Sequence, residues 1–290
     1  MLIYKALIAP FFEFEFMRRA LVGACALALG AGPVGVLLML RRMSLMGDAM
    51  AHAILPGAAI GFLLAGFNLF ALTVGGLAAG LVVALLAGFV ARTTELKEDA
   101  ALAAFFLVSL AIGVTIVSLR GSNIDLLHFL FGSVLALDNQ TLVLIASIAT
   151  LSLGVLSVIW RPLVLDCVDP GFLRSVSRSG APVHTLFLAL VVLNLVGAFH
   201  ALGTLLAVGM MMLPAVASRF WVRDITPMIL MAIGIGMLSG YAGLLLSFHT
   251  AVPAGPAIIL VAGLVYAGSV IFGRVGGLAR QLFPGRHLEA

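Results

Sequence analysis

Charged residues are scarce in this sequence. Its 290 residues include 16 Lys or Arg and 12 Asp or Glu, only 10% of the chain, whereas 63% are hydrophobic. A soluble domain is roughly a quarter charged, so this chain has too few charges to cover a surface that faces water. The composition therefore excludes a soluble enzyme and indicates a protein that lies within a lipid bilayer.

The sequence also has few cysteines and lacks a nucleotide-binding loop. Cys25 and Cys167 lie far apart, so they form neither a disulfide framework nor a thiolate metal cage. No Gly-x-x-x-x-Gly-Lys-Ser/Thr motif occurs, so any ATP must be hydrolysed by another protein. We expect no cleavable signal peptide, because Glu13 and Glu15 precede the first long apolar run. The net charge of +4 and the pI near 9.6 are explained by basic loops, and we expect no nucleic-acid partner.

Long apolar runs dominate what is present, and the mean hydropathy is +1.23. A run of about 20 apolar residues crosses the roughly 30 Å hydrocarbon core of a bilayer. We predict spans at residues 17–40, 47–66, 69–91, 100–119, 140–159, 183–201, 203–218, 226–247 and 254–272. The span at 203–218 is short and carries Pro214, which favours a broken or re-entrant helix there.

These spans predict an all-α integral membrane protein, a polytopic bundle of about eight or nine transmembrane helices in one domain. We assign residues 1–16 to an N-terminal interfacial segment, 17–273 to the transmembrane domain and 274–290 to a cytoplasmic tail. The orientation follows from the basic loops, because Lys and Arg are enriched on the cytoplasmic side. Basic residues occur at 41–42, 92–97, 161–178, 219–223 and in the tail, in alternation with neutral or acidic loops. Arg18 and Arg19 disagree with this pattern.

Glycines recur at a spacing of four within several predicted spans. The pairs are Gly57/Gly61, Gly76/Gly80 and Gly236/Gly240. Small residues at this spacing let helix backbones approach closely in a bilayer. The pairs therefore predict a tightly packed bundle.

Asp48 and His52 are ionisable residues within a predicted span, where such groups are costly and mark function. Their spacing of four places both side chains on one face of a helix. Carboxylate and imidazole groups are ligands for zinc or manganese, although two of them cannot complete a coordination shell. A second copy of the chain would supply two more. Alternatively, Ser44 or Asp48 caps the helix and His52 only packs against a neighbour.

Other polar segments have weaker patterns. Asp125 and His128 in an outer loop are candidates to admit the metal, or are ordinary interfacial residues. Pro56 is expected to leave a backbone carbonyl without its helical partner. Two segments are candidate docking surfaces for a cytoplasmic ATPase, or ordinary connections: the polar loop 165–182 and the region Pro214, Ala215, Ser218, Arg219, Phe220, Trp221 and Asp224.

Residues 41–57, RRMSLMGDAMAHAILPG, closely resemble the second-span signature of the zinc/manganese/iron ABC importer permeases. Further similar segments follow in order: Lys97–Ala101, Phe129–Gly132, Asp169–Phe172, Gly203–Val208, Leu213–Ala215 and Val252–Pro256. The resemblance covers nearly the whole chain. The loop at 174–180 departs from the family pattern by being more basic and polar.

The resemblance implies a fold like that of the vitamin B12 and siderophore importer permeases, in a bacterial cytoplasmic (inner) membrane. It implies a homodimer, two copies of a cytoplasmic ATPase, and a periplasmic or lipid-anchored metal-binding protein. It also implies that Asp48 and His52 coordinate the ion and that the Pro214–Asp224 region contacts the ATPase. The overall similarity favours zinc as cargo, with manganese or iron as alternatives. No permanently bound cofactor and no enzymatic activity of the subunit are expected.

Three further interpretations remain from the residues. A secondary transporter or channel would use Asp48 and His52 as a proton relay. An intramembrane hydrolase would use them to hold a catalytic zinc, but it needs a third ligand. A siderophore or cobalamin permease is possible by fold, but it would be expected to need a wider path and would have no use for the Asp48/His52 pair.

Overall fold

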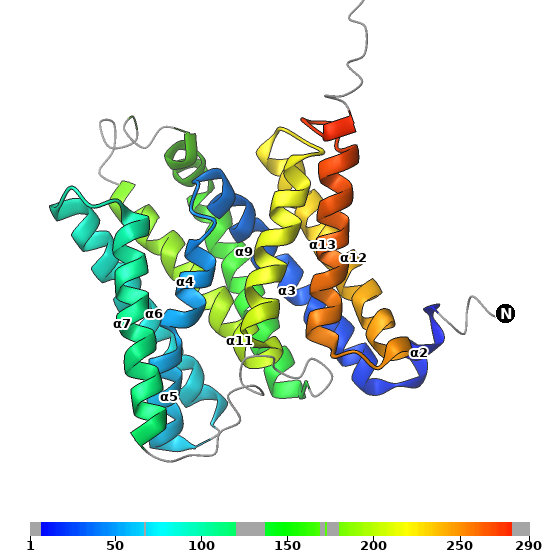
Figure 1. The fold of residues 1–290 in the computed structure, drawn as a ribbon, viewed down its shortest axis with the longest axis horizontal. Helices are drawn as coiled ribbons and strands as arrows, with labels where there is room; N and C mark the ends of the chain where they lie inside the picture. Colours follow the sequence, from blue (N-terminus) through cyan, green and yellow to red (C-terminus); the bar gives the residue numbers. More distant parts are fainter. Residues whose placement is uncertain (1–6, 67, 120–136, 169–171, 173–179, 280–290) are drawn as a thin grey trace, which may run out of the picture.

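The computed structural model describes residues 7–66, 68–119, 137–168, 172 and 180–279. These residues are arranged in helices and short connections, without a strand in the described ranges (Figure 1). The helices are α2 (Ala9–Glu13), α3 (Glu15–Leu40), α4 (Met46–Ala53), α5 (Leu55–Ala65), α6 (Leu69–Thr93), α7 (Glu98–Leu119), α9 (Asn139–Val168), α11 (Gly180–Arg219), α12 (Ile225–Thr250) and α13 (Ala254–Phe272).

Eight helical segments of the described chain are long and apolar enough to cross a membrane. A ninth apolar segment, Gly203–Arg219, is shorter. The prediction of eight or nine helices in an all-α membrane bundle is therefore confirmed, with the predicted weak span as the short one.

The position of the break in α11 corrects the prediction. Gly203 has φ 80° and ψ 165°, a conformation outside the helical region, whereas the helix continues through Pro214. A glycine adopts positive φ without the clash that a Cβ would cause. A proline within a membrane helix is tolerated where neighbouring groups compensate for its missing N–H. The break therefore lies eleven residues before Pro214 by their numbers.

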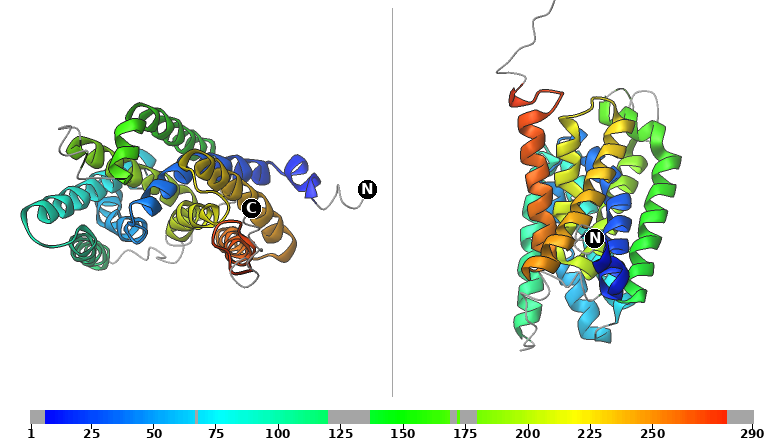
Figure 2. Two further views of the ribbon diagram at one scale, coloured as in Figure 1. Left: turned by 90° about the horizontal axis from the view of Figure 1, so that it is seen from above. Right: turned by 90° about the vertical axis from the view of Figure 1, so that its right-hand side faces the viewer.

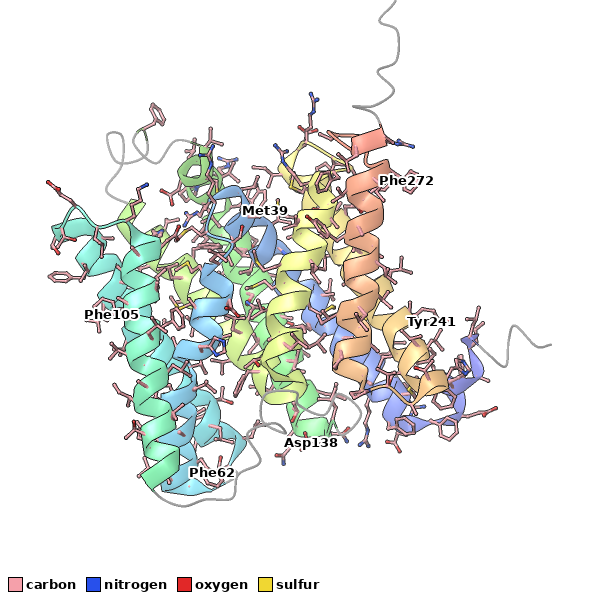
Figure 3. The ribbon with its side chains drawn as sticks, viewed as in Figure 1. Met39, Phe62, Phe105, Asp138, Tyr241 and Phe272 are labelled. Carbon is pink, nitrogen blue, oxygen red and sulfur yellow. The ribbon has the colours of Figure 1, made fainter. Side chains whose placement is uncertain are left out.

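The basic loops gather at one end of the bundle. Met39 and Phe272 lie near the upper end in Figure 3, and Phe62 and Asp138 lie near the opposite end. The upper end, called the basic end below, carries the connections 41–45, 94–97 and 220–224 and residues 273–279 after α13. The arrangement agrees with the alternation predicted from the loop charges. Arg19 lies at the other end, where it pairs with Glu15 at 2.5 Å.

Two predicted boundaries shift. Helix α9 continues to Val168, beyond the predicted end near residue 159, because apolar residues follow Pro162 and keep the helix favourable. Within the predicted interfacial segment 1–16, residues Ala9–Glu13 form the separate helix α2 at one long end of the bundle, and α3 already begins at Glu15 (Figure 2). The Phe11 ring stacks on Tyr241 at 5.1 Å, and the Tyr241 hydroxyl donates to the Leu7 carbonyl at 2.9 Å.

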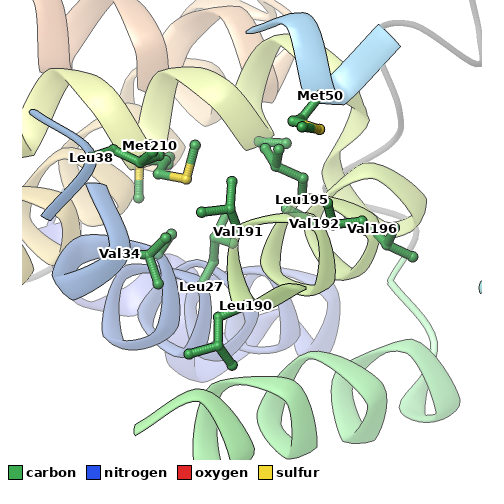
Figure 4. Packing of buried hydrophobic residues seen from close by; sticks show 14 of the residues in the cluster. Leu27, Val34, Leu38, Met50, Leu190, Val191, Val192, Leu195, Val196 and Met210 are labelled. Carbon is green, nitrogen blue, oxygen red and sulfur yellow. The ribbon is translucent and has the colours of Figure 1, made fainter. Parts of the chain in front are cut away.

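Helix α3 and the first part of α11 form the centre of the bundle. Their most apolar windows are 72% and 67% buried, against 22–44% for the other spans. Leu27 and Val34 of α3 pack beside Val191 and Leu195 of α11, and Met50 of α4 lies against the same cluster (Figure 4). The short helix α4 therefore packs against the most buried part of the described bundle.

Candidate metal path

The span that carries Asp48 and His52 is divided into α4 and α5 at Ile54, close to Pro56. A proline has no N–H to donate, so the helical partner of the His52 carbonyl is lost. The buried hydroxyl of Ser109 in α7 donates to the neighbouring carbonyl of Ala53 at 3.0 Å. Gly113 allows α7 to approach, since a Cβ there would lie 3.1 Å from the Pro56 nitrogen. The break is thus supported by α7.

Asp48 and His52 lie together on α4, as the spacing predicts. Asp48 Oδ1 is 3.8 Å from His52 Nε2, and the two side chains are 66% and 31% exposed. Two ligand atoms on one tetrahedral zinc-sized ion lie about 3.4 Å apart, given bond lengths near 2.1 Å. A small side-chain rotation would therefore let both atoms bind one ion.

The capping alternative is not what the structure shows. The N-cap of α4 is Leu45, and no side chain caps the helix. Asp48 lies within the first turn and is directed outward, with two thirds of its side chain exposed. An exposed carboxylate on a membrane span is available to a cation or to a second chain.

His52 is oriented by packing. Its ring lies 6.3 Å from that of Phe106, with an angle of 29° between the planes. The Nδ1 atom is buried and has no hydrogen-bond partner within the described chain. A buried polar atom without a partner is costly, and a metal-binding histidine commonly donates its second nitrogen to a partner. The face with Nε2 and Asp48 is the open one.

One chain supplies an incomplete site. No group of three or more His, Cys, Asp or Glu side chains comes together among the described residues. Two ligands per chain suit transient binding better than a closed structural site. Asp125 and His128, the candidates to admit the metal, lie outside the described residues.

The predicted coupling residues differ in their exposure. Pro214, Ala215 and Ser218 are buried within α11, and the Ser218 hydroxyl donates to the Ala215 carbonyl at 2.7 Å. Phe220 and Trp221 are half-buried. Arg219 and Asp224 are exposed, as is Arg223 between them. Direct contact with another protein is therefore open to the charged residues of this region and not to the three buried ones.

Half-buried Phe220 and Trp221 are fixed to the end of α13. The Trp221 indole donates to Ser269 Oγ at 2.9 Å, and the backbone N–H of Val275 donates to the Phe220 carbonyl at 2.7 Å. A Cβ on Gly273 would lie 2.6 Å from Phe220 Cβ. The turn after α11 and the end of α13 are thus one packed unit at the basic end.

Sequence reasoning missed a polar cluster around Arg41. The guanidinium pairs with Asp166 and contacts Nδ1 of His184 at 3.0 Å. These partners are 125 and 143 residues away in sequence, so no local motif connects them. An available signal was that Asp166 and His184 both lie close to predicted span ends on the basic side.

The sequence matches the model of the ABC 3 transport family over residues 13–273. It is 33% identical to the manganese import system permease protein ScaB of Streptococcus parasanguinis over 254 residues, which are 88% of this chain and 89% of that protein. It is 30% identical to the manganese transport system membrane protein MntC of Halalkalibacterium halodurans over 278 residues, 96% of this chain and 94% of that one.

Solved structures show the same fold. One is PsaBC from Streptococcus pneumoniae in complex with Fab, with a TM-score of 0.83 and 28% identity, covering 95% of this chain and 98% of that chain. Another is an inward-facing metal-chelate type ABC transporter, with a TM-score of 0.70 over 90% of this chain and 87% of that one. Its 14% identity supports a shared fold alone.

These findings confirm the resemblance drawn from residues 41–57 and the prediction of a multi-pass protein of the bacterial inner membrane. The relatives are permease subunits, and the family implies an ATPase partner and a substrate-binding protein. The chain belongs to the ABC 3 transport family and is the membrane permease subunit of an ABC importer of metal ions.

Proposed function

We propose that this permease carries a divalent transition metal ion inward and that Asp48 and His52 are its ligands within the membrane. The observation that carries the proposal is the Asp48–His52 pair itself. It places a carboxylate and an imidazole 3.8 Å apart on an open helix face, within a span. The alternative role of Asp48 as a side-chain cap has less support, because Leu45 is the N-cap of α4 and no side-chain hydrogen bond caps that helix.

We propose manganese as the cargo in place of the zinc that the sequence favoured. Carboxylate and imidazole groups accept either ion, and ligand chemistry alone does not select between them. The support comes from the relatives, whose names specify manganese. Zinc is the alternative outcome of the transport test below.

A homodimer would bring more protein ligands to the ion, with the remaining positions of an octahedral Mn²⁺ shell left to water. A second copy would contribute another Asp48 and His52, which gives four protein ligands in place of two. The ion would pass between the copies as ATP binding and hydrolysis rearrange the helices. A periplasmic or lipid-anchored binding protein would deliver it, and two copies of a cytoplasmic ATPase would supply the energy. The subunit would require no permanently bound cofactor.

We propose the basic end as the cytoplasmic, ATPase-facing side. Residues 1–16 would then lie at the outer interface, 17–273 would form the permease domain and 274–290 a cytoplasmic tail. Within the region Pro214–Asp224, Arg219 and Asp224 are exposed and would make contact directly. Buried Pro214, Ala215 and Ser218 would pass the movement into α11, and Phe220 and Trp221 would pass it to α13.

ATP-dependent uptake into vesicles tests this assignment. The permease, its ATPase and its binding protein are reconstituted, and uptake of Mn²⁺ and Zn²⁺ is measured separately and in competition. We expect Asp48→Asn and His52→Gln each to lower uptake at least about tenfold, because even residues behind a metal ligand contribute that much. Asp138→Asn and His249→Gln, at exposed positions of the opposite end, should transport normally.

Three outcomes would change the proposal. Normal uptake in both pair variants, at matched amounts of assembled complex, would refute the site. Preference for Zn²⁺ in competition would restore zinc as the cargo. Uptake that needs a proton gradient and no ATP would indicate a secondary transporter with the pair as a proton relay.

A further inference from the structure

A buried charge network joins three helices at the basic end. The Arg41 side chain, at the end of α3, is 5% exposed and pairs with Asp166 of α9, which is 12% exposed. Arg41 Nη1 also lies 3.0 Å from Nδ1 of His184 in α11. The guanidinium stands over the Phe187 ring, 4.5 Å from its centroid. None of these residues is a proposed metal ligand or belongs to the Pro214–Asp224 region, although Asp166 lies in the polar segment 165–182 that the sequence offers as a second ATPase-facing candidate.

The connection from Arg41 to α4 is short, and backbone hydrogen bonds hold it in place. Arg42 adopts the left-handed conformation with φ 60°, and the N–H of Met43 donates to the Leu38 carbonyl at 3.0 Å. This is the hydrogen bonding of a helix end closed by a left-handed residue. The N–H of Met46 then donates to the Met43 carbonyl at 3.0 Å, and α4 begins. The position of Arg41 is therefore transmitted to α4 without a flexible linker.

Helix α4 is held at both ends. At its far end, Ser109 of α7 donates to the Ala53 carbonyl. At its near end, the turn that begins with Arg41 is tied to α9 and α11. Asp48 and His52 lie between these two attachments, and two thirds of the Asp48 side chain is exposed.

An ion pair is an unusual means of holding this turn. A buried guanidinium is costly unless it is paired, and apolar packing would be at least as stabilising. Arg41 Nε has no hydrogen-bond partner within the described chain, so even this network leaves a buried donor unsatisfied. What a paired charge adds over apolar contacts is direction, because a guanidinium binds a carboxylate in a defined geometry.

We propose that Arg41 is a positioning residue for metal transport, and that its pairing with Asp166 and His184 sets α4 so that Asp48 and His52 present their ligand atoms to one ion. The inference rests on the proposed function of Asp48 and His52. Arg41 does not touch the ion. Its contacts are with Asp166, His184 and Phe187, so it acts on the proposed ligands through the position of α4.

Mn²⁺ binding to the assembled permease–ATPase complex in nanodiscs, followed by electron paramagnetic resonance, tests the proposal. We expect Arg41→Met to weaken Mn²⁺ binding by roughly tenfold or more. Asp166→Asn keeps the shape of its side chain and should weaken binding in the same direction. Arg41→Lys should retain part of the affinity, and the charge exchange Arg41→Asp with Asp166→Arg should recover affinity relative to either single change.

The matched control is Arg42→Met, which removes the same charge from the adjacent, exposed position and should bind Mn²⁺ normally. Wild-type affinity in both Arg41→Met and Asp166→Asn would overturn the proposal. If the Arg41→Met complex does not assemble, the Asp166→Asn variant decides the question. An unchanged Mn²⁺ affinity in that variant would contradict the proposal, and a tenfold loss would support it. Asp48→Asn is measured in parallel: unchanged affinity there would instead refute the proposed metal site.

Discussion

Asp48 and His52, the two proposed ligands, lie in different environments on one helix. Asp48 is two-thirds exposed, whereas the less exposed His52 ring packs beside the Phe106 ring. A pair of ligands with one exposed and one packed member would bind an ion and release it without a large change in the protein. This property fits transport, because a transported ion must leave.

Asp138 allows a prediction on pH. Hydrogen bonds from the Thr141 hydroxyl and from its backbone N–H, the latter at 2.9 Å, lower the pKa of Asp138 below its ordinary value of 3.8. A lowered pKa in the folded state stabilises the protein above the ordinary value, and this contribution is lost as the pH falls through the lowered one. Below about pH 4, we expect the unfolding temperature to decrease more in the wild-type protein than in Asp138→Asn.

Asp138 immediately precedes α9 and caps it by accepting the hydrogen bond from the Thr141 backbone N–H. Asparagine also caps helices and does so at every pH, so Asp138→Asn keeps the cap and removes the titration. Thermal unfolding in detergent at pH 7 and at pH 3 measures the difference. At pH 7, Asp138→Ala should lose about 1 kcal/mol of stability, the usual contribution of a helix cap. An identical pH dependence in wild type and Asp138→Asn would show that the cap does not titrate.

At the scale of elements, α5 and α6 pack with their backbones nearly in contact. A Cβ on Gly57 would lie 2.0 Å from the Gly75 carbonyl oxygen, whereas a Cβ on Gly88 of α6 would meet nothing within 4 Å. We expect Gly57→Ala to lower the unfolding temperature, because backbone cannot move aside as a side chain can. Gly88→Ala should leave it unchanged or raise it, since alanine is the better helix former by up to about 1 kcal/mol.

Thermal unfolding of both variants in the same detergent checks this contrast, and equal effects would contradict it.

The spacing of Gly57 and Gly61 predicted a close approach of another helix, and this prediction is confirmed. A Cβ on Gly61 would also meet α6, at 2.5 Å from the Ala71 carbonyl oxygen. The neighbour in contact could not be read from a spacing within one helix.

At the scale of the whole molecule, the number of ligands predicts a stoichiometry. The described residues bring two proposed metal ligands, Asp48 and His52, close together, and no group of three or more His, Cys, Asp or Glu side chains occurs among them. If two copies share one ion, saturating Mn²⁺ should bind at one ion per two permease chains. Equilibrium dialysis of the assembled complex, with Asp48→Asn as the zero reference, measures this ratio. A ratio of one ion per chain would show that a single copy completes its own site.

Local sequence patterns determined much of this protein. Apolar runs give the membrane spans, because the bilayer selects for length and hydropathy residue by residue. The basic loops predicted the arrangement of the two ends, and a spacing of four predicted that Asp48 and His52 share a helix face. Each of these features depends on near neighbours in the chain.

Tertiary structure decided the rest. Gly203, not Pro214, interrupts α11, because a proline can stay helical where the surrounding helices compensate for it. Pro214, Ala215 and Ser218 are buried although they stand next to exposed charges. In the sequence, nothing distinguishes Arg41 from the other basic loop residues, and only the packing of α9 and α11 brings Asp166 and His184 to it. Contacts between residues more than a hundred positions apart depend on how the helices pack, and the periodicity of a single helix does not predict that packing.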